Sequence, residues 1–349
     1  MKSSIVLADK KEFVVIDCLK FIASYMVLGI HFMIFYDVDR KLDFWATQIL
    51  FRLAVPFFFV ASGFFLANKL KDKRKMLGYL KRIFLTYVVY TVVYIPILWD
   101  KYERLGYTLK MRVEDFLYAF FVSGSFFHLW YFVAVIVATL ILYMMINHLQ
   151  LSDKKLLVIT GILYAIGTLG NAYRNIWVHV PIIDSIFTAY ESVLGTTRNG
   201  IFMGPFLMAL GYLMRKHSDK ITYKRYWLYA ILLFVLMNVE EYFAKAITNH
   251  VGQSMLFVTP AVIVMIFLAA SFIRIPEKLV PIGIFLRNMG VVVYAFHMFF
   301  HEKYGNELSG YAPYGFVYYL MIAKRVTILA FIIVGLSRIK IFSWLKYFY

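Results

Sequence analysis

The sequence has 349 residues, of which 62% are hydrophobic and 19% aromatic, whereas only 16% are charged. This composition, with a mean hydropathy of +0.71, excludes an ordinary soluble protein and an intrinsically disordered chain. The single cysteine, Cys18, excludes an internal disulfide and a cluster of thiolate metal ligands. We therefore predict an all-α membrane bundle, because helices pair every backbone amide inside a bilayer.

Ten apolar windows have lengths suited to membrane-spanning helices, although three of them are short. They cover residues 13–36, 45–67, 79–99, 129–147, 156–171, 200–214, 226–245, 254–273, 288–301 and 322–338. The first window follows a polar segment and has no small-residue cleavage site after it, so we predict a retained span and not a signal peptide. No repeat or change of composition divides the chain, which predicts one membrane-embedded domain over residues 1–349.

Basic residues predict the orientation of these spans. If the windows alternate in direction, one side of the membrane receives 23 of the 37 Lys and Arg residues. Cytoplasmic loops carry such an excess, so both termini are predicted to be cytoplasmic (N-in/C-in). The bias also explains the net charge of +17 and favours the lipid bilayer over nucleic acid as the partner of the basic segments. Residues 100–128 and 172–199 would then lie outside, the first with an interfacial or re-entrant helix.

The first window carries three ionisable residues on one helix face. Asp17 and Lys20 are three residues apart, and His31 follows Lys20 by eleven, which is within about 20° of three whole turns and about 16 Å along the axis. Ser24 completes this stripe. An ionisable residue costs at least about 2.5 kcal/mol at the bilayer centre unless it faces protein or water. The stripe predicts a polar channel, and the plain alternative is an ion pair that snorkels to the interface.

The predicted orientation places nearly all other intramembrane polar residues at the outer level, together with His31. They are Arg52, His128, Arg198, Asn199, Glu240, Glu241, His297 and His301. His128 and Arg198 lie close to span ends, where an ordinary interfacial residue is the alternative. Adjacent residues point about 100° apart on a helix, so either Glu240 or Glu241 can face inward as an intramembrane acid.

The sequence contains no pattern that is typical of a metal, phosphate-loop or serine-hydrolase site. His297 and His301 have the spacing of helical metal ligands, but no Glu follows the first histidine. No glycine-rich phosphate loop or nucleophile elbow is present either. We therefore expect no bound metal.

Four stretches in order resemble the acyltransferase type 3 family of integral membrane proteins. Lys20, followed by ten residues and His31, is similar to the Arg/Lys-x10-His signature of that family. Residues 54–66, 128–132 and 294–297 resemble three further blocks. The likeness covers nearly the whole chain and implies ten spans in the plasma membrane of a bacterium.

This resemblance implies transfer of an acyl group, with acetyl as the expected one, from cytoplasmic acyl-CoA to a hydroxyl of an envelope glycan or lipid-linked sugar outside. His31 would be the general base or a transient acyl carrier. Lys20, oriented by Asp17, would hold CoA phosphate or stabilise negative charge, with Lys81 and Arg82 as further phosphate contacts. The outer polar residues would bind the acceptor. One departure is that many acetylating members have Arg-x-x-Arg where this chain has Arg82-Ile-Phe-Leu85.

Two other interpretations stay open. Residues 50–56 and 197–204 look closest to the membrane half of vancomycin-resistance-type serine racemases, whose racemase half has no counterpart in this sequence. That likeness implies a transporter of serine or a similar amino acid, in which Arg198 holds the carboxylate and Glu240 or Glu241 the ammonium. The remaining interpretation is a scaffold or sensor whose polar residues only fix the helices.

Overall fold

The computed structural model describes residues 13–248, 255–305 and 313–349, and every regular element in these ranges is a helix. The longer α-helices are α1 (Val14–Phe32), α3 (Ala54–Leu70), α4 (Lys73–Arg104), α7 (Asp153–Leu169), α10 (Tyr226–Thr248), α12 (Val280–Tyr304) and α13 (Phe316–Leu336). The shorter ones are α2 (Arg40–Asp43), α5 (Leu109–Tyr118), α6 (Trp130–Tyr143), α8 (Pro181–Leu194), α9 (Met203–Lys216) and α11 (Thr259–Ser271). The predicted all-α fold is confirmed for the described part of the chain.

Several helices begin or end in π or 3-10 turns, which change the direction of the side chains. The π-helical turns are η2 (Phe44–Leu50), η4 (Ala119–Ser123) and η6 (Met144–His148). The 3-10 turns are η3 (Phe51–Leu53), η5 (Phe127–Leu129), η7 (Arg174–His179), η8 (Glu277–Leu279) and η9 (Lys340–Phe348). Such turns often mark functional positions, and both η3 and η5 carry a polar residue of the candidate site.

Among the described residues, six helical segments are long and apolar enough to cross a membrane. They are Val14–Phe32, Arg40–Leu70, Lys73–Arg104, Leu109–His148, Glu277–Tyr304 and Phe316–Leu336. The other four predicted windows fall on α7, α9, α10 and α11, of which α9 has 14 residues and α11 has 13. A span needs about 20 residues, so the structure supports a membrane protein without confirming the count of ten.

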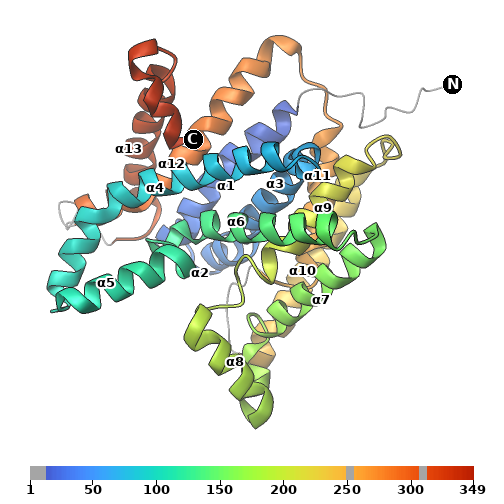
Figure 1. Cartoon of the computed structure of the whole chain (residues 1–349), viewed down its shortest axis with the longest axis horizontal. Helices are drawn as coiled ribbons and strands as arrows, with labels where there is room; N and C mark the ends of the chain where they lie inside the picture. Colours follow the sequence, from blue (N-terminus) through green and yellow to red (C-terminus); the bar gives the residue numbers. More distant parts are fainter. Residues whose placement is uncertain (1–12, 249–254, 306–312) are drawn as a thin grey trace.

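Two helix pairs form the centre of the bundle. α1 packs along α12, and α3 packs along α9. One apolar core surrounds α3 and α9, and a second surrounds α1, α4, α12 and α13. Figure 1 shows α8 at the periphery and α5 reaching out to one side, whereas α1 and α3 lie near the middle of the view. Polar residues of α1 and α12 therefore face each other in the protein interior.

The contact of α3 with α9 depends on two glycines. A Cβ atom on Gly63 would collide with the carbonyl oxygen of Met208, and one on Gly211 would collide with the carbonyl oxygen of Val60. The two backbones therefore touch without an intervening side chain, as small residues allow in membrane helices. This contact fixes α9 and with it the preceding segment 196–202, which carries Arg198.

The orientation of the bundle stays a prediction, and labelling checks it. We expect a reporter fused after Tyr349 to be active in the cytoplasm, because of the basic bias of the predicted inner segments. A cysteine introduced at Asn175, which is exposed, should react with an impermeant thiol reagent in intact cells. Labelling at this position only after lysis would contradict the predicted orientation.

Candidate active site

The polar stripe of α1 begins at a buried carboxylate. Asp17 is 5% exposed, and its Oδ1 atom lies 3.6 Å from Nζ of Lys20. Its Oδ2 atom lies 3.5 Å from Nη1 of Arg287 on α12. The ammonium group of Lys20 also lies 4.1 Å from the ring centroid of Phe65 on α3. The predicted Asp17–Lys20 pair is therefore present, and α12 supplies a second cation to it.

A cavity of about 680 Å³ adjoins this pair, and we call it the basic cavity. Its cationic lining residues are Lys20, Lys69, Lys75, Arg82 and Arg287. Aromatic and hydroxyl groups complete the wall, and Ser62 Oγ lies 3.0 Å from Tyr131 Oη within it. Lys81, also expected to bind phosphate, is exposed and is not one of the described residues that line this cavity. Arg82 is one of them, and its Nη2 atom donates to the main-chain carbonyl of Tyr349 at 3.1 Å.

Three histidines meet at the other end of the α1 stripe, and we call them the histidine cluster. They are His31 on α1, His128 on η5 and His297 on α12. The rings of His31 and His297 are stacked, with centroids 5.1 Å apart and planes inclined by 29°. His128 meets His297 edge to face at 4.9 Å. The sequence placed these residues at one level, and the structure brings them into contact.

Hydrogen bonds fix which nitrogens of the cluster carry protons. His297 Nδ1 lies 2.6 Å from the carbonyl oxygen of Tyr294, and His128 Nε2 lies 3.0 Å from that of Ala295. A carbonyl only accepts, so these nitrogens donate, and the neutral rings carry lone pairs on His297 Nε2 and His128 Nδ1. Both of those atoms are buried without a hydrogen-bond partner in the described part of the chain. The cluster can therefore accept protons from a ligand.

Local backbone geometry aims His128 at the cluster. Gly124 has a φ of 91°, in the left-handed region, and a Cβ atom there would collide with the backbone of Trp130. Glycine therefore allows the chain to reverse closely before η5 and α6. The hydroxyl of Tyr294 then donates to the main-chain carbonyl of His128, which fixes η5 against α12.

Two arginines lie near the histidine cluster. Arg52 is on η3 and donates from Nη2 to Gln48 Oε1 at 2.7 Å. Arg198 lies over the ring of Trp130, with 5.2 Å between Cζ and the ring centroid. The charges of both arginines act on His31. The side of the site that holds the histidines is therefore strongly cationic.

The two adjacent glutamates have different environments. Glu240 Oε1 accepts from the main-chain nitrogen of Phe257 at 2.7 Å, and Oε2 accepts from that of Val258 at 2.8 Å. Glu240 therefore holds the two residues that directly precede α11. Glu241 is 2% exposed, and its charge acts on Arg52. Glu241 is the inward-facing member of the pair.

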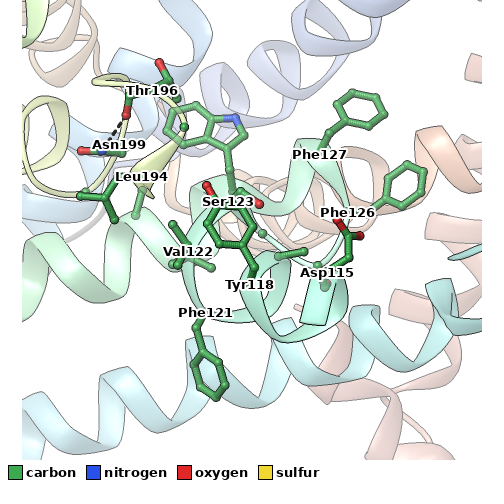
Figure 2. Close-up of a pocket in the computed structure, with 18 of the residues that line it drawn as sticks. Asp115, Tyr118, Phe121, Val122, Ser123, Phe126, Phe127, Leu194, Thr196 and Asn199 are labelled. Atoms are coloured by element: carbon green, nitrogen blue, oxygen red, sulfur yellow. Dashed lines mark hydrogen bonds between the residues drawn. The ribbon is translucent and has the colours of Figure 1, made fainter. Parts of the chain in front are cut away.

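A second cavity of about 530 Å³ lies beside Arg198, and we call it the Arg198 cavity. Figure 2 shows side chains of α5, η4 and η5 on one side of it and those of the segment 194–199 on the other. Asn199 shapes that segment, because its Oδ1 accepts from the main-chain nitrogen of Ile201 at 2.9 Å and its Nδ2 donates to the carbonyl of Thr196 at 2.7 Å. The cavity combines aromatic walls with hydroxyl, amide and charged groups.

The histidine cluster contacts the wall of each cavity. Phe127 lines the Arg198 cavity, and its ring centroid lies 5.3 Å from that of His31. Tyr294 lines the basic cavity, and its ring centroid lies 6.0 Å from that of His128. One aromatic ring on each side therefore separates the histidines from the two cavities.

Sequence reasoning missed two residues that the structure places at the site. Arg287, which directly precedes the predicted window 288–301, contacts Asp17. Tyr294 lies in one of the blocks that resemble the family, and it lines the basic cavity and binds the backbone of His128. The available signal for Arg287 is its charge in a run from residue 282 to 300 that is apolar apart from Asn288 and His297.

Comparison with known proteins identifies the family of the chain. A family model described as an acyltransferase domain, of the acyltransferase type 3 family, matches residues 13–347. A serine/alanine racemase of Enterococcus gallinarum is 29% identical over 258 residues, which cover 72% of this chain and 36% of the relative. An amino-acid racemase of Enterococcus faecalis is 29% identical over 262 residues, with the same coverage of 72% and 36%.

A further amino-acid racemase of Enterococcus faecalis is 30% identical over 67% of this chain and 31% of the relative. The chain thus spans about a third of the length of the curated relatives it matches. No solved structure matches the chain significantly. The family model, by contrast, covers nearly every residue. The protein therefore belongs to the acyltransferase type 3 family of multi-pass membrane proteins.

Proposed function

We propose that the protein is an O-acyltransferase of a bacterial cytoplasmic membrane. It transfers an acyl group, acetyl in the simplest case, from acyl-CoA to a hydroxyl of an extracytoplasmic glycan or lipid-linked sugar. The observation that carries this proposal is that the histidine cluster contacts the walls of both cavities, one of which is basic. A base between two binding sites suits a reaction in which two substrates meet.

The basic cavity supports acyl-CoA as the acyl donor. Its five cations suit the phosphate groups of CoA, because lysine offers a point charge and arginine a planar fork with several donors. Asp17 holds Lys20 and Arg287 close together and so directs both toward the cavity. The pantetheine arm of CoA separates its phosphates from its thioester. Lys20 and His31 are about 16 Å apart along the axis of α1. Phosphates near Lys20 are therefore compatible with a thioester near His31.

His31 is the best candidate for the general base. Within the described part of the chain its ring makes no hydrogen bond, and its stacking on His297 fixes the plane of the ring. In the proposed step, His31 takes the proton of the acceptor hydroxyl while the oxygen attacks the thioester carbonyl. The thioester carbon–sulfur bond then breaks, and the proton passes to the sulfur of CoA. Nearby cations stabilise the oxyanion that forms between these events.

Liposomes that contain the purified protein test this function directly. Acetyl-CoA labelled in the acetyl group is supplied on one face, and a mixture of cell-envelope glycans and lipid-linked sugars on the other. We expect label in an alkali-labile ester in the acceptor fraction, and none with protein-free liposomes. Label that stays in acetyl-CoA, or passes only to water, would contradict the proposal.

Lys20 tests the assignment of the basic cavity. Lys20→Ala should weaken the apparent affinity for acyl-CoA more than Lys20→Arg does, because the site needs a positive charge next to Asp17. A charge-assisted hydrogen bond is worth about 1.5 to 3 kcal/mol, so we expect roughly a 10- to 100-fold rise in KM for acyl-CoA in Lys20→Ala. Lys81→Ala is the matched control, since that lysine is exposed. Equal KM values for Lys20→Ala and the parent would favour the snorkelling interpretation.

Transport of serine or a similar amino acid is the second candidate function. The relatives named amino-acid racemases favour it, and so does the presence of Arg198 and the inward-facing Glu241 near one site. The same liposomes, supplied with labelled serine, distinguish the two functions. Saturable uptake that is lost in both Arg198→Gln and Glu241→Gln, without ester formation, would make a carrier the better account. If neither ester formation nor uptake occurs, the result favours a scaffold or sensor in which the polar residues only fix the helices.

A further inference from the structure

Arg52 and Arg198 form no ion pair with any carboxylate that the structure describes. Among the residues that the structure describes, neither guanidinium lies within 4.0 Å of a carboxylate, and the hydrogen bond from Arg52 to Gln48 is to a neutral amide. The Nε atom of each arginine is buried and has no hydrogen-bond partner there. Arg198 instead rests on the face of Trp130. Two guanidinium groups with unused donors thus lie in one region of the protein.

This arrangement is costly unless a ligand completes it. A buried donor without a partner costs about 1 to 3 kcal/mol, and more when it is charged. The positive charges of Arg52 and Arg198 also repel each other. Glu241 offsets only part of this charge, since it acts on Arg52. Among the described residues, this leaves about one unit of positive charge that a bound anion would neutralise.

The place of Arg198 shows where such an anion would bind. Arg198 lines the Arg198 cavity, and the charges of both arginines act on His31. The cavity also has acidic lining residues, Asp115 and Glu302. Asp115 already accepts a hydrogen bond from the hydroxyl of Tyr102 at 2.8 Å, and neither acid forms an ion pair with Arg198 among the described residues. Lys101 is the other cation that lines the cavity, and Arg198 is the one whose charge acts on the proposed base.

We infer that the acyl acceptor carries an anionic group, a carboxylate or a phosphate, which Arg198 binds with the support of Arg52 beside the hydroxyl that His31 deprotonates. This inference rests on the proposed function and narrows its acceptor to sugars with a negative charge close to the acylated position. Either source of charge suits the planar fork of arginine, which binds carboxylate and phosphate through two parallel hydrogen bonds.

Three sugars that differ in charge test the inference. Glucose is neutral, glucuronate supplies a carboxylate, and glucose 1-phosphate supplies a phosphate. Each is titrated into the detergent-purified full chain in the presence of saturating CoA, which occupies the basic cavity, and the thermal unfolding temperature is recorded. We expect stabilisation by at least one anionic sugar and none by glucose at equal concentration and ionic strength. The stronger of the two responses identifies carboxylate or phosphate as the natural group.

Matched variants assign the effect to the two arginines. Arg198→Gln should lower the affinity for the anionic sugar about 10- to 100-fold, as expected for loss of a charge-assisted hydrogen bond. Arg198→Lys should keep part of this affinity, because lysine retains the positive charge but lacks the planar guanidinium group that binds an anion through two hydrogen bonds. Arg225→Gln, in an exposed loop, and Arg82→Gln, in the basic cavity, should leave the response to anionic sugars unchanged.

Two results would overturn the inference. The first is equal stabilisation by glucose and by both anionic sugars. The second is an anion response that Arg198→Gln leaves intact while Arg82→Gln removes it, since the anion then binds in the basic cavity. Ester formation with acetyl-CoA is measured on the same preparations. If esters form on a neutral acceptor as fast as on a charged one, the inference fails while the proposed acyltransferase function stands. If no ester forms, the proposed function fails by itself.

Discussion

His31→Gln and His31→Ala are expected to abolish acyl transfer while the protein still folds. His31 is the member of the histidine cluster on the polar stripe of α1, and it lies against Phe127 at the wall of the Arg198 cavity. A positioned general base contributes about 10²- to 10⁴-fold to the rate. We therefore expect kcat to fall by about 10²-fold or more, with little change in KM for acyl-CoA. Glutamine keeps a hydrogen-bonding group but cannot take the proton, so it should fail as alanine does.

The measurement is the initial rate of ester formation in liposomes at several acyl-CoA concentrations. His148→Gln is the matched control, because His148 is exposed and lies outside the cluster. This control should keep the parental rate. If either His31 variant keeps more than about a tenth of the parental kcat, the loss is well below the range for a general base. His31 would then not be the general base.

Gly63→Ala is expected to give a large loss of stability. The added methyl group would meet the carbonyl oxygen of Met208, and a backbone atom cannot rotate away as a side chain can. Overpacking of a core typically costs about 1 to 3 kcal/mol, occasionally more. Because α9 must then move away from α3, we also expect the segment that carries Arg198 to shift and acyl transfer to weaken.

Thermal unfolding in detergent, followed by size-exclusion chromatography of the heated samples, measures this effect. Gly335→Ala on α13 is the matched control, since a Cβ atom there has no neighbour within 4 Å. At this open helical site alanine should leave the protein as stable as the parent or stabilise it by up to about 1 kcal/mol, because alanine has the higher helix propensity. If Gly63→Ala and Gly335→Ala unfold at the same temperature, the direct backbone contact between α3 and α9 does not exist in the protein.

The sequence alone determined the class of fold, because the bilayer imposes a simple rule. An apolar segment must pair its own backbone amides, so long apolar windows become helices whatever surrounds them. All ten predicted windows coincide with helices, within the described residues. Whether each helix spans the membrane could not be read in the same way, because a helix such as α11, with 13 residues, can be buried by its neighbours in the bundle without crossing a bilayer.

Local spacing also determined which residues of one helix act together. Asp17 and Lys20 face each other because a helix brings residues three apart to one side, and the 3.6 Å contact follows from that periodicity. The adjacent small residues Ser62 and Gly63 also suit close packing, since small residues occur where membrane helices touch. The sequence could not say that Met208 is what Gly63 meets.

Contacts between distant segments were decided only by the tertiary structure. His31, His128 and His297 lie on three elements far apart in the chain, and their rings meet because α1 packs along α12 and η5 folds back at Gly124. The sequence predicted that the three histidines lie at one membrane depth, but it could not predict that their helices bring them into contact. Depth follows from hydropathy along a single helix, whereas the angle at which one helix faces another depends on side-chain packing over the whole interface.

The same distinction separates Glu240 from Glu241. Helical periodicity showed that the two side chains point in different directions, but it could not show which direction is the interior. The structure decides this through the residues just before α11, because the main-chain N–H groups of Phe257 and Val258 bind Glu240. Glu241 therefore lies on the side of Arg52. Only the packing of α10 against α11 brings these N–H groups within reach of Glu240.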